Sequence, residues 1–597
     1  MDFLRPPYRC HRGQLISWAI FFIILFALEA LFLISQLSTE SLKSEDVSKH
    51  EELSTDKRPY DRRSHALHTQ TRTHQLEDLL KGILRKHLRP PDSAYNFNVS
   101  ISDAIPLSRH IADTRPKGCD ALIYKVPIGV SVSVIVIFYN EAFTTLMRTA
   151  HSVLERSPKS MLKELILVDD FSSNKDLGHD LDMYVKALDP RVHILRNPER
   201  QGLVRSRLYG ANMATGDVLV WLDAHTECNV GWLEPLVYEL FKNNVTIVQP
   251  HVDVISSDTI QFFAYPGDVY RGGFGWDLRY AWYKLPKYLS QVLTSKLDPF
   301  PTPILVGCAI AARKDYFVAT GQFDDGLNIW GGEHFDLSFR TWLCGGRILT
   351  VPCSRVGHMF KQFAYDFNGD RSSIIRKNLM RVADIWLDEY KWIFESVSLT
   401  FGQEPRVSVE EMHSRVKRKH LRKTLNCKPF RWFLQNVMPE IRIPSKLDDF
   451  FGEITNHKTA QCWGPLLDGY IAITNECYMH RILPENHFSL DKKSQLVHEG
   501  QCVYMDESNL LLRKTKCMCV HELKGRGWKF NVIGKVGGQL IYKDTRGIFW
   551  CAKHVTNITP LHFGKQMVQM GRCNHQDPYQ IWTFTYKLTE IKHNNYM

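Results

Sequence analysis

Between residues 131 and 225 the sequence alternates between two kinds of segment, and this alternation limits the possible folds more than any other feature. Apolar, β-branched runs of strand length occur at residues 131–140, 162–170, 191–198 and 217–225. Helix-like segments lie between them at residues 143–157 and 202–216, and the first carries apolar residues at helical spacing. Strands that alternate with helices predict an α/β fold, with a parallel sheet covered by helices on both faces.

Polar side chains that can bind ligands follow these predicted strands. They are Asn140, Asp169, Asp170, Asp223 and His225. In open α/β sheets, ligands bind at the carboxyl ends of the strands. The sequence therefore predicts a binding site at this edge of the sheet.

Asp223 and His225 lie in the stretch VWLDAHTECN, directly after an apolar run. One interpretation is structural, with an aspartate that caps the following helix beside an incidental histidine. The other is a metal site, because a carboxylate and a neutral imidazole together suit a borderline divalent ion such as manganese. An ion with open coordination positions can bridge two phosphates and neutralise the charge on a leaving diphosphate. This chemistry fits a sugar-nucleotide donor.

The N-terminus contains an apolar stretch long enough to span a membrane. Residues 15–34 form this stretch, and about 20 residues at ~1.5 Å per residue cross a bilayer. Arginines precede it, and no basic residue follows before Lys43, so the positive-inside rule leaves residues 1–14 in the cytosol. We expect an uncleaved signal anchor over residues 15–36, with a cleaved signal peptide as the alternative.

Cysteines and glycosylation sequons agree with this orientation. Of 14 cysteines, only Cys10 would be cytosolic, and the others would lie in an oxidising compartment. Sequons at Asn98, Asn244 and Asn557 would be accessible to glycosylation enzymes there. The net charge of +11 is spread along the chain without a nucleic-acid-binding motif, so we expect no nucleic-acid partner.

At 597 residues the chain is too long for one core, and its character changes along its length. Residues 37–115 are polar and charged, which predicts a stem with a partial helix around residues 76–88. From residue 451 onwards, short β-like runs alternate with turns and cysteine pairs recur. The runs lie near Ile471, Cys502, Leu510, Phe530, Leu540 and Trp582. Three weakly similar units predict a β-trefoil-like module.

Three longer motifs resemble a known family. In chain order they are RNPERQGLVRSRLYGANMATGDVLVWLDAHTECNVGWLEPLV, GLNIWGGEHFDLSFRTWLCGGRILTVPCSRVGHMF and ADIWLDEYK. Together they are similar to the polypeptide N-acetylgalactosaminyltransferases. The resemblance implies a glycosyltransferase A domain of Rossmann-like α/β fold over residues 116–450, followed by an all-β, ricin-type β-trefoil lectin-like domain over residues 451–597.

The resemblance also implies an activity and a location. Members of this family transfer N-acetylgalactosamine from its uridine diphosphate donor to Ser and Thr hydroxyls of secretory polypeptides, with manganese and with retention of configuration. The location implied is the Golgi membrane, as a single-pass type II protein with a luminal catalytic part. The sequence offers no carboxylate pair like that of a retaining glycosidase. We therefore expect a front-face mechanism, in which the departing diphosphate helps to take the acceptor proton.

Carried over residue by residue, the resemblance implies a set of site residues. The implied metal ligands are Asp223, His225 and His358. Trp330 and Glu333, in WGGE, match the catalytic-loop tryptophan and the essential acid. The implied donor-binding residues are Asp170, Arg200, Arg207, Asp223, Gly307, Trp330, Lys361 and Tyr365. Without the resemblance, His358 would be interpreted as structural and the glycines before Glu333 as a tight turn.

Several residues depart from the family pattern near the implied donor site. Cys308 stands where most members have glycine, His334 where asparagine is usual, Lys361 where arginine is expected and Gln201 where glutamate is usual. A lysine ammonium does not replace the bidentate fork of an arginine without loss. These departures motivate an alternative function, that of a catalytically weak or silent paralogue which binds acceptor peptides or partner transferases as a Golgi scaffold.

The lectin-like module departs further. Family repeats begin with Cys-Leu-Asp, whereas here they begin CWG, CVY and CAK, and only Gln580 to Trp582 keeps a Gln-x-Trp. We interpret that element as a core brace, and Asp506 and Asp544 as solvated turn residues. We therefore expect a folded trefoil with weak or absent glycan binding. This disfavours a third interpretation, that of a carbohydrate-binding protein.

The resemblance implies disulfides as well. The implied pairs are Cys119–Cys353 and Cys344–Cys427 in the catalytic domain and one bridge in each trefoil repeat. Spacing suggests Cys462 with Cys477, Cys502 with Cys517 or Cys519, and Cys551 with Cys573. Cys228, Cys308 and one of Cys517 and Cys519 would remain unpaired, and the Cys308 thiol would face the donor site.

Overall fold

The computed structural model describes residues 75–85, 92–265, 269–361, 366–367, 369–398, 407–467, 470–474, 486–517, 525–533, 537–556 and 566–588. The predicted signal anchor, residues 15–36, lies outside this part of the chain. Within the described residues, no helix has the length and apolar character that a membrane span requires. Residues 75–85 are helical, in agreement with the partial helix predicted in the stem.

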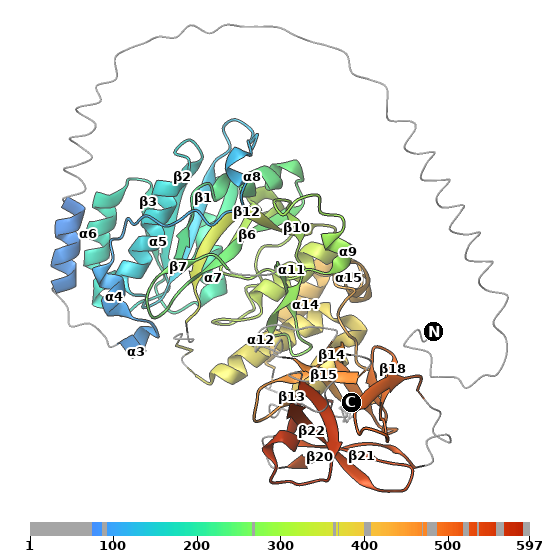
Figure 1. Cartoon of the computed structure of the whole chain (residues 1–597). Helices are drawn as coiled ribbons and strands as arrows, with labels where there is room; N and C mark the ends of the chain where they lie inside the picture. The colour runs from blue at the N-terminus through green and yellow to red at the C-terminus, as the bar shows by residue number, and fades with distance from the viewer. Residues whose placement is uncertain are drawn as a thin grey trace. The chain divides into compact units, whose positions relative to one another are not determined.

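A ten-stranded mixed sheet forms the centre of the N-terminal part of the fold (Figure 1). Across the sheet the strands are β10 (Phe300–Pro301), β12 (Arg347–Met359), β6 (Thr246–Ile255), β11 (Ala309–Arg313), β4 (Val218–Asp223), β1 (Val132–Phe138), β2 (Leu162–Asp169) and β3 (Val192–Arg196). The strands β1 to β4 are parallel, as predicted. β11 runs antiparallel to both β4 and β6, a reversal that the sequence pattern did not predict. Two short strands extend the sheet, β5 (Thr226–Cys228) beside β12 and β7 (Phe262–Phe263) beside β6.

Helices cover both faces of this sheet, because successive side chains along a strand point to opposite faces. In β1, Ile135 and Ile137 belong to one buried core, while Val134 and Val136 belong to another. The first core includes apolar residues of α7 (Leu203–Met213), α11 (Glu333–Leu343), α12 (Arg371–Trp386), α13 (Lys391–Ser398) and α15 (Phe430–Asn436). The second includes those of α5 (Phe143–Arg156), α6 (His179–Leu188) and α8 (Leu233–Lys242). The prediction of helices on both faces is confirmed.

Further elements belong to this part of the fold. They are α3 (Asp92–Tyr95), α4 (Val99–Ala104), the hairpin of β8 (Tyr270–Phe274) and β9 (Tyr280–Lys284), α9 (Lys287–Ser290), α10 (Lys314–Ala319) and α14 (Val409–Thr424). The segment that carries α3 and α4 packs on the sheet, since Tyr95, Phe97 and Val99 share a buried cluster with Ile255 and Met359. Residues 92–115, expected in the stem, therefore contact the α/β core.

In the C-terminal part, the described residues from 448 onwards form strands and short helical turns. The strands are β13 (Asp448–Asn456), β14 (Cys462–Leu467), β15 (Tyr470–Thr474), β16 (Phe488–Asp491), β17 (Leu496–His498), β18 (Gln501–Met505), β19 (Leu512–Thr515), β20 (Gly527–Ile533), β21 (Gly537–Lys543), β22 (Phe549–Thr556), β23 (Gln566–Gly571) and β24 (Trp582–Lys587). They form one 12-stranded sheet, in which pairing of β14 with β15 closes a ring. The predicted β runs fall within β15, β18, β20, β21 and β24, and β19 begins two residues after Leu510.

The disulfides agree with the implied pairing. Cys119 is bonded to Cys353, Cys344 to Cys427 and Cys551 to Cys573. Cys462, Cys502 and Cys517 are disulfide-bonded too. Cys477 and Cys519 lie outside the described residues. Cys228 and Cys308 are free and buried, as predicted.

The turn carboxylates of the C-terminal part correct one prediction. Asp544 is not solvated, because it is 1% exposed and accepts hydrogen bonds from the indole of Trp550 and the guanidinium of Arg546. Asp506 is also largely enclosed and accepts a hydrogen bond from the hydroxyl of Tyr470. Aspartate side chains at turns are usually exposed to solvent, but here aromatic and basic neighbours cover the two carboxylates. The interpretation of Gln580 and Trp582 as a core brace agrees with their burial.

Candidate functional site

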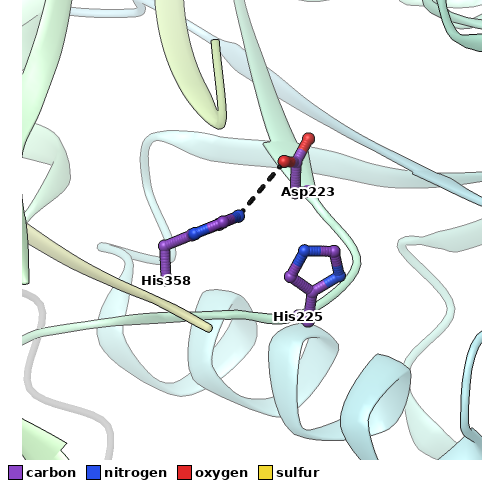
Figure 2. A group of neighbouring side chains, drawn as sticks. All are labelled: Asp223, His225 and His358. Atoms are coloured by element: carbon purple, nitrogen blue, oxygen red, sulfur yellow. Dashed lines mark ion pairs between the residues drawn. The ribbon is translucent and has the colours of Figure 1, made fainter. Parts of the chain in front are cut away.

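The carboxyl edge of the sheet brings together the three predicted metal ligands. Asp223 ends β4, His225 follows it, and His358 is the penultimate residue of β12. One side-chain ligand atom from each of the three lies within 4.8 Å of the others. Figure 2 shows the group, in which His358 Nε2 lies 3.3 Å from the Asp223 carboxylate. Residues from two distant parts of the chain thus form one cluster, as the resemblance implied.

Strand pairing sets the separation of the two histidines. β5 runs antiparallel to β12, with Thr226 opposite His358. The backbone N–H of Met359 donates to the carbonyl of His225 at 3.2 Å. Because both histidines flank this ladder, their imidazole rings are neighbours, with centroids 4.9 Å apart and planes inclined at 53°. The geometry of the pair therefore depends on where β5 is held.

The electrostatics favour the ionised form of Asp223 and the neutral form of His358. Burial opposes ionisation of Asp223, but the hydrogen bond from His358 and the charge of Arg207 outweigh it and lower the pKa of the Asp223 carboxyl. Burial also lowers the pKa of His358, helped by the nearby His225 and Lys361. A carboxylate and neutral imidazoles are the forms that bind divalent metal ions.

Glu141 is a part of this site that the sequence analysis did not single out. Its carboxylate, 7% exposed, lies 2.8 Å from Nδ1 of His225 and accepts two hydrogen bonds from Lys361 Nζ at 2.9 and 3.0 Å. Burial disfavours the charge, yet Lys361 and His225 together hold the pKa of Glu141 far below its usual range. Its position could have indicated this role. Glu141 follows β1 directly after Asn140, at the edge of the sheet where ligand-binding residues were expected.

Arg207 connects the candidate metal ligand Asp223 to Glu333. Its guanidinium is 1% exposed, donates to the carbonyl of Gly307 at 2.6 Å and to the Asp223 carboxylate at 3.2 Å, and lies 3.6 Å from Glu333. Glu333 begins α11 after Gly331 and Gly332, whose φ angles of 101° and 92° are in the left-handed region. Burial opposes ionisation of Glu333, but His334 and Arg207 outweigh it and lower the pKa of this carboxyl.

Asp170 and Arg200 form a second polar cluster beside the site. The Asp170 carboxylate is fully buried, pairs with Arg200, and accepts the backbone N–H groups of Gln201 and Gly202 at 2.8 and 2.9 Å. The Arg200 guanidinium lies 3.5 Å from the ring centroid of Tyr139. These contacts hold the turn before α7.

The structure places the other predicted donor-binding residues as follows. Trp330 is half-buried, and its carbonyl accepts a hydrogen bond from Asn378. Gly307 has a φ of 90° and lies between Arg207 and His334. The Lys361 ammonium is bound to Glu141. Tyr365 lies outside the described residues.

The residues that depart from the family pattern line the same region. Cys308 is 4% exposed, and burial together with the charge of Asp223 raises the pKa of its thiol well above the ordinary value. His334 Nδ1 lies 3.6 Å from Glu333, while its Nε2 is buried and has no hydrogen-bond partner among the described residues. Cys308 follows Gly307 directly, and a Cβ on Gly307 would lie 3.8 Å from that of His334. The carbonyl of Cys308 accepts the backbone N–H of Asp223 at 3.0 Å, so Cys308 lies beside a candidate metal ligand.

The donor set fits a divalent transition metal. One carboxylate and two imidazoles, all close together, match the mixed oxygen and nitrogen ligands of manganese or zinc. The carboxylate of Glu141 at Nδ1 of His225 is the outer partner that metal-binding histidines ordinarily have. The residues present therefore fit such an ion.

This fold and site define a glycosyltransferase of the glycosyltransferase A type. The model of the family described as Glycosyl transferase family 2 matches residues 133–319, which contain β1 to β4 and two of the three candidate ligands. A crystal structure of GalNAc-T7 with UDP, GalNAc and Mn²⁺ superimposes with a TM-score of 0.56 at 29% identity, covering 83% of this chain and 89% of that one.

Relatives narrow the class further. A Caenorhabditis elegans protein named probable N-acetylgalactosaminyltransferase 6 is 34% identical over 511 residues, which cover 82% of this chain and 78% of the relative. Polypeptide N-acetylgalactosaminyltransferase 13 of Rattus norvegicus is 41% identical over 368 residues, 61% of this chain and 65% of the relative. Polypeptide N-acetylgalactosaminyltransferase 4 of Mus musculus is 42% identical over 364 residues, and the match spans 60% of both chains. The chain belongs to the polypeptide N-acetylgalactosaminyltransferase family.

Proposed function

We propose that the protein transfers N-acetylgalactosamine from UDP-N-acetylgalactosamine to Ser or Thr hydroxyls of polypeptides, with retention of configuration. The observation that carries this proposal is the cluster of Asp223, His225 and His358 beside the buried Arg207–Glu333 pair. The related GalNAc-T7, whose crystal structure contains UDP, GalNAc and Mn²⁺, supports the choice of donor and metal.

The roles of the site residues follow from their charges. Asp223, His225 and His358 would hold manganese, which when bound neutralises the charge of the leaving diphosphate. Arg207 is aimed between Asp223 and Glu333, where its guanidinium would donate charge-assisted hydrogen bonds to the donor. Glu333, ionised by its basic neighbours, would accept a hydrogen bond from the donor sugar or the acceptor and so orient it.

Other residues would bind the rest of the donor. Asp170 and Arg200 build the turn before α7, and we assign them to the nucleotide. Trp330, Gly307, Lys361 and Tyr365 would enclose the sugar and diphosphate. No side-chain nucleophile is needed, since the departing diphosphate would take the acceptor proton as the new glycosidic bond forms on the same face.

We further propose the domain plan that the family resemblance implies. Residues 116–450 would form the catalytic domain. Residues 451–597 would form a ricin-type β-trefoil, and the closed ring of strands supports this fold. Its glycan binding would be weak or absent. A signal anchor over residues 15–36 and a stem over 37–115 would place the protein in the Golgi membrane with its catalytic part in the lumen. The disulfides support an oxidising compartment.

Transfer to mucin-like peptides tests the activity. With manganese and UDP-N-acetylgalactosamine, mass spectrometry should detect added N-acetylhexosamine, and Asp223→Asn should reduce the rate by at least about a hundredfold, because one metal ligand loses its charge. Asp217→Asn, a change at the opposite end of β4 where Asp217 binds Ser131, serves as the control. A folded protein without transfer to naked or glycosylated peptides, and without donor hydrolysis, would refute the proposal.

That outcome would favour a second function, a scaffold that binds acceptor peptides or partner transferases. Three observations support it: Lys361 is paired with Glu141, Cys308 lies beside Asp223, and His334 lies beside Glu333. Restoration of activity by the combined changes Cys308→Gly, His334→Asn and Lys361→Arg would distinguish a silenced site from one that never had the activity.

A further inference from the structure

The short strand that follows the candidate metal ligands is held from two sides. β5 begins one residue after His225 and pairs with β12 on one side. On the other side lies α5, where the hydroxyl of Thr149 lies 2.8 Å from the carbonyl of Thr226 and accepts its N–H at 3.2 Å. The hydroxyl of Ser152 accepts the N–H of Cys228 at 3.0 Å. These contacts hold the backbone of β5 at Thr226 and Cys228. Glu227, between them, is held through its side chain.

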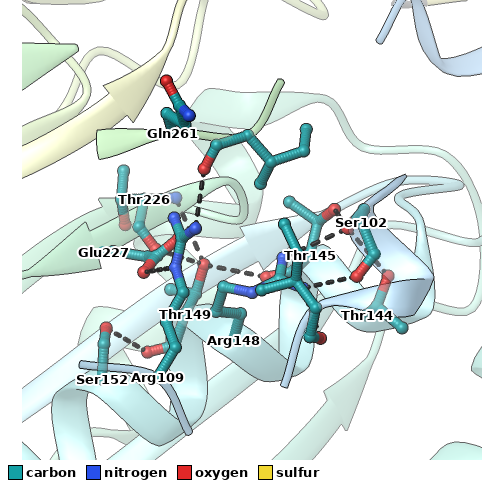
Figure 3. A network of polar contacts seen from close by, with 12 residues as sticks. Ser102, Arg109, Thr144, Thr145, Arg148, Thr149, Ser152, Thr226, Glu227 and Gln261 are labelled. Atoms are coloured by element: carbon teal, nitrogen blue, oxygen red, sulfur yellow. Dashed lines mark hydrogen bonds and ion pairs between the residues drawn. The ribbon is translucent and has the colours of Figure 1, made fainter. Parts of the chain in front are cut away.

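Glu227 is bound by an arginine from a distant part of the chain. Its carboxylate, 4% exposed, accepts Nε and Nη2 of Arg109 at 2.9 and 2.6 Å, and the Arg109 side chain is 13% exposed (Figure 3). The third nitrogen, Nη1, donates to the carbonyl of Ile260 at 2.7 Å. Arg109 therefore links β5 to the turn after β6 through three hydrogen bonds, and two of them form the parallel pair that suits a guanidinium and a carboxylate.

The segment that carries Arg109 is itself fixed to the helix behind the site. Arg156 of α5 donates to the carbonyl of Arg109, and Arg148 of the same helix donates to the carbonyl of Ser102 at 2.6 Å. Burial lowers the pKa of Arg148 to about 10, and the Glu227 carboxylate acts against that shift. Arg109 thus approaches Glu227 from a fixed backbone, and among the described residues it is the one basic side chain that forms an ion pair with Glu227.

We propose that Arg109 is a positioning residue for the metal site, acting through Glu227 to hold β5 and with it the separation of His225 from His358. The proposal rests on the proposed function, because it assumes that these histidines bind manganese. Arg109 lies outside the residues 133–319 that match the glycosyltransferase family model, so the site depends on a segment that precedes this core.

The physical reason is the cost of a buried charge without its partner. Loss of the guanidinium would leave the Glu227 carboxylate enclosed and unpaired, and such groups move towards water or take up a proton. In either case the middle of β5 is no longer tied to the turn after β6, and the neighbouring residues of β5 form the ladder opposite His358. Because metal ions require ligand positions within a few tenths of an ångström, a small shift of His225 lowers affinity before it unfolds the chain.

Manganese titration calorimetry on the full-length protein and its variants tests this role. Arg109→Gln should raise the Kd for Mn²⁺ about tenfold, the lower end for an outer partner of metal ligands. Arg109→Lys, which keeps the charge but not the fork, should raise it less. Glu227→Gln should raise Kd as well, and the Arg109→Gln/Glu227→Gln double variant should fall short of the product of the two single effects, because both remove one interaction.

Arg191→Gln is the matched control. Arg191 also binds a carboxylate through Nε and Nη2, that of Asp189, and reaches a carbonyl through Nη1, but it lies at the amino end of β3. The Arg191→Gln variant should have a lower melting temperature but an unchanged Kd for Mn²⁺. Equal Kd values for the wild-type protein, Arg109→Gln and Arg109→Lys would overturn the proposal, as would an equal loss of affinity in Arg191→Gln. Absence of manganese binding by the wild-type protein would instead refute the proposed metal site.

Discussion

Among the site residues that were not predicted, Glu141 makes the most important contacts. Its carboxylate bonds both His225 and Lys361, and no other acidic side chain among the described residues contacts both. An acceptor at Nδ1 fixes the tautomer of a metal-binding histidine and leaves Nε2 free for the ion. Glu141 therefore determines which nitrogen of His225 faces the metal position.

Glu141→Gln should weaken manganese binding by about 10-fold to 100-fold, the usual effect of removing such an outer partner. The amide is neutral, so it binds the imidazole N–H less strongly and leaves the Lys361 ammonium without a counter-charge. Calorimetric titration with MnCl₂ measures the change. Glu155→Gln is the control, because Glu155 also lies within hydrogen-bonding distance of a histidine Nδ1, that of His151, at 3.2 Å. Unchanged affinity in Glu141→Gln would show that Lys361 and His225 do not need this carboxylate.

The candidate metal ligands Asp223 and His225 could be predicted from the residue pattern and His358 only through the family resemblance, whereas the residues that orient them could not be predicted. Asp223 and His225 end an apolar strand, and this is a local pattern that single-sequence reasoning detects. Glu141 and Glu227 act through partners 84 and 118 positions away. Nothing in a short window shows such contacts, because they arise only when strands and loops come together in the fold.

At the scale of elements, the backbone of the turn before α7 lies very close to the backbone of the loop that carries Trp330. Gly202 has a φ of 84°, forms a bridge with Ile329, and gives its N–H to Asp170. A Cβ added to Gly202 would lie 2.4 Å from the Cα of Ile329, which precedes Trp330. The turn and the Trp330 loop are therefore packed against each other at a position that requires glycine.

Gly202→Ala should destabilise the protein by about 1–3 kcal/mol, because the positive φ and the backbone contact both oppose a side chain. It should also raise the KM for the donor, since the Trp330 loop must move to admit the methyl group. Urea unfolding and donor-dependent kinetics measure the two effects. Gly500→Ala, at a φ of 77° with no atom within 4 Å of the new Cβ, controls for backbone strain alone. A KM that changes equally in both variants would contradict the role of the contact.

Strand existence was easier to predict than strand direction. The parallel order of β1 to β4 follows from alternation with helices, because each crossover returns the chain to the same edge. The antiparallel placement of β11 between β4 and β6 has no periodic signal, since a buried strand has the same apolar pattern in either direction. Cys308 precedes this strand, so its place beside Asp223 became visible only with the sheet order.

At the scale of the whole molecule, acidification should weaken the C-terminal part through a buried histidine. His487 is 7% exposed, and its Nδ1 has no hydrogen-bond partner among the described residues. Burial, with help from Arg442 and His498, lowers its pKa to about 3. In the unfolded chain a histidine has a pKa of about 6.5. Between these values the unfolded chain binds more protons than the folded one, so stability rises with pH and is lost on acidification.

Below pH 6.5 the free energy of unfolding should therefore fall by about 1.4 kcal/mol per pH unit through His487 alone, or about 2 kcal/mol by pH 5. His487→Phe should remove this part of the slope, and a phenyl ring suits the edge-to-face contact with Phe451, whose ring centroid lies 5.4 Å away. Urea unfolding from pH 5 to 7.5, followed by a probe of the C-terminal part, compares the two slopes. The exposed His575 provides the control, because His575→Phe should leave the slope unchanged. If the wild-type protein and His487→Phe lose stability equally on acidification, His487 takes up its proton without unfolding, and its neutral form does not stabilise the fold.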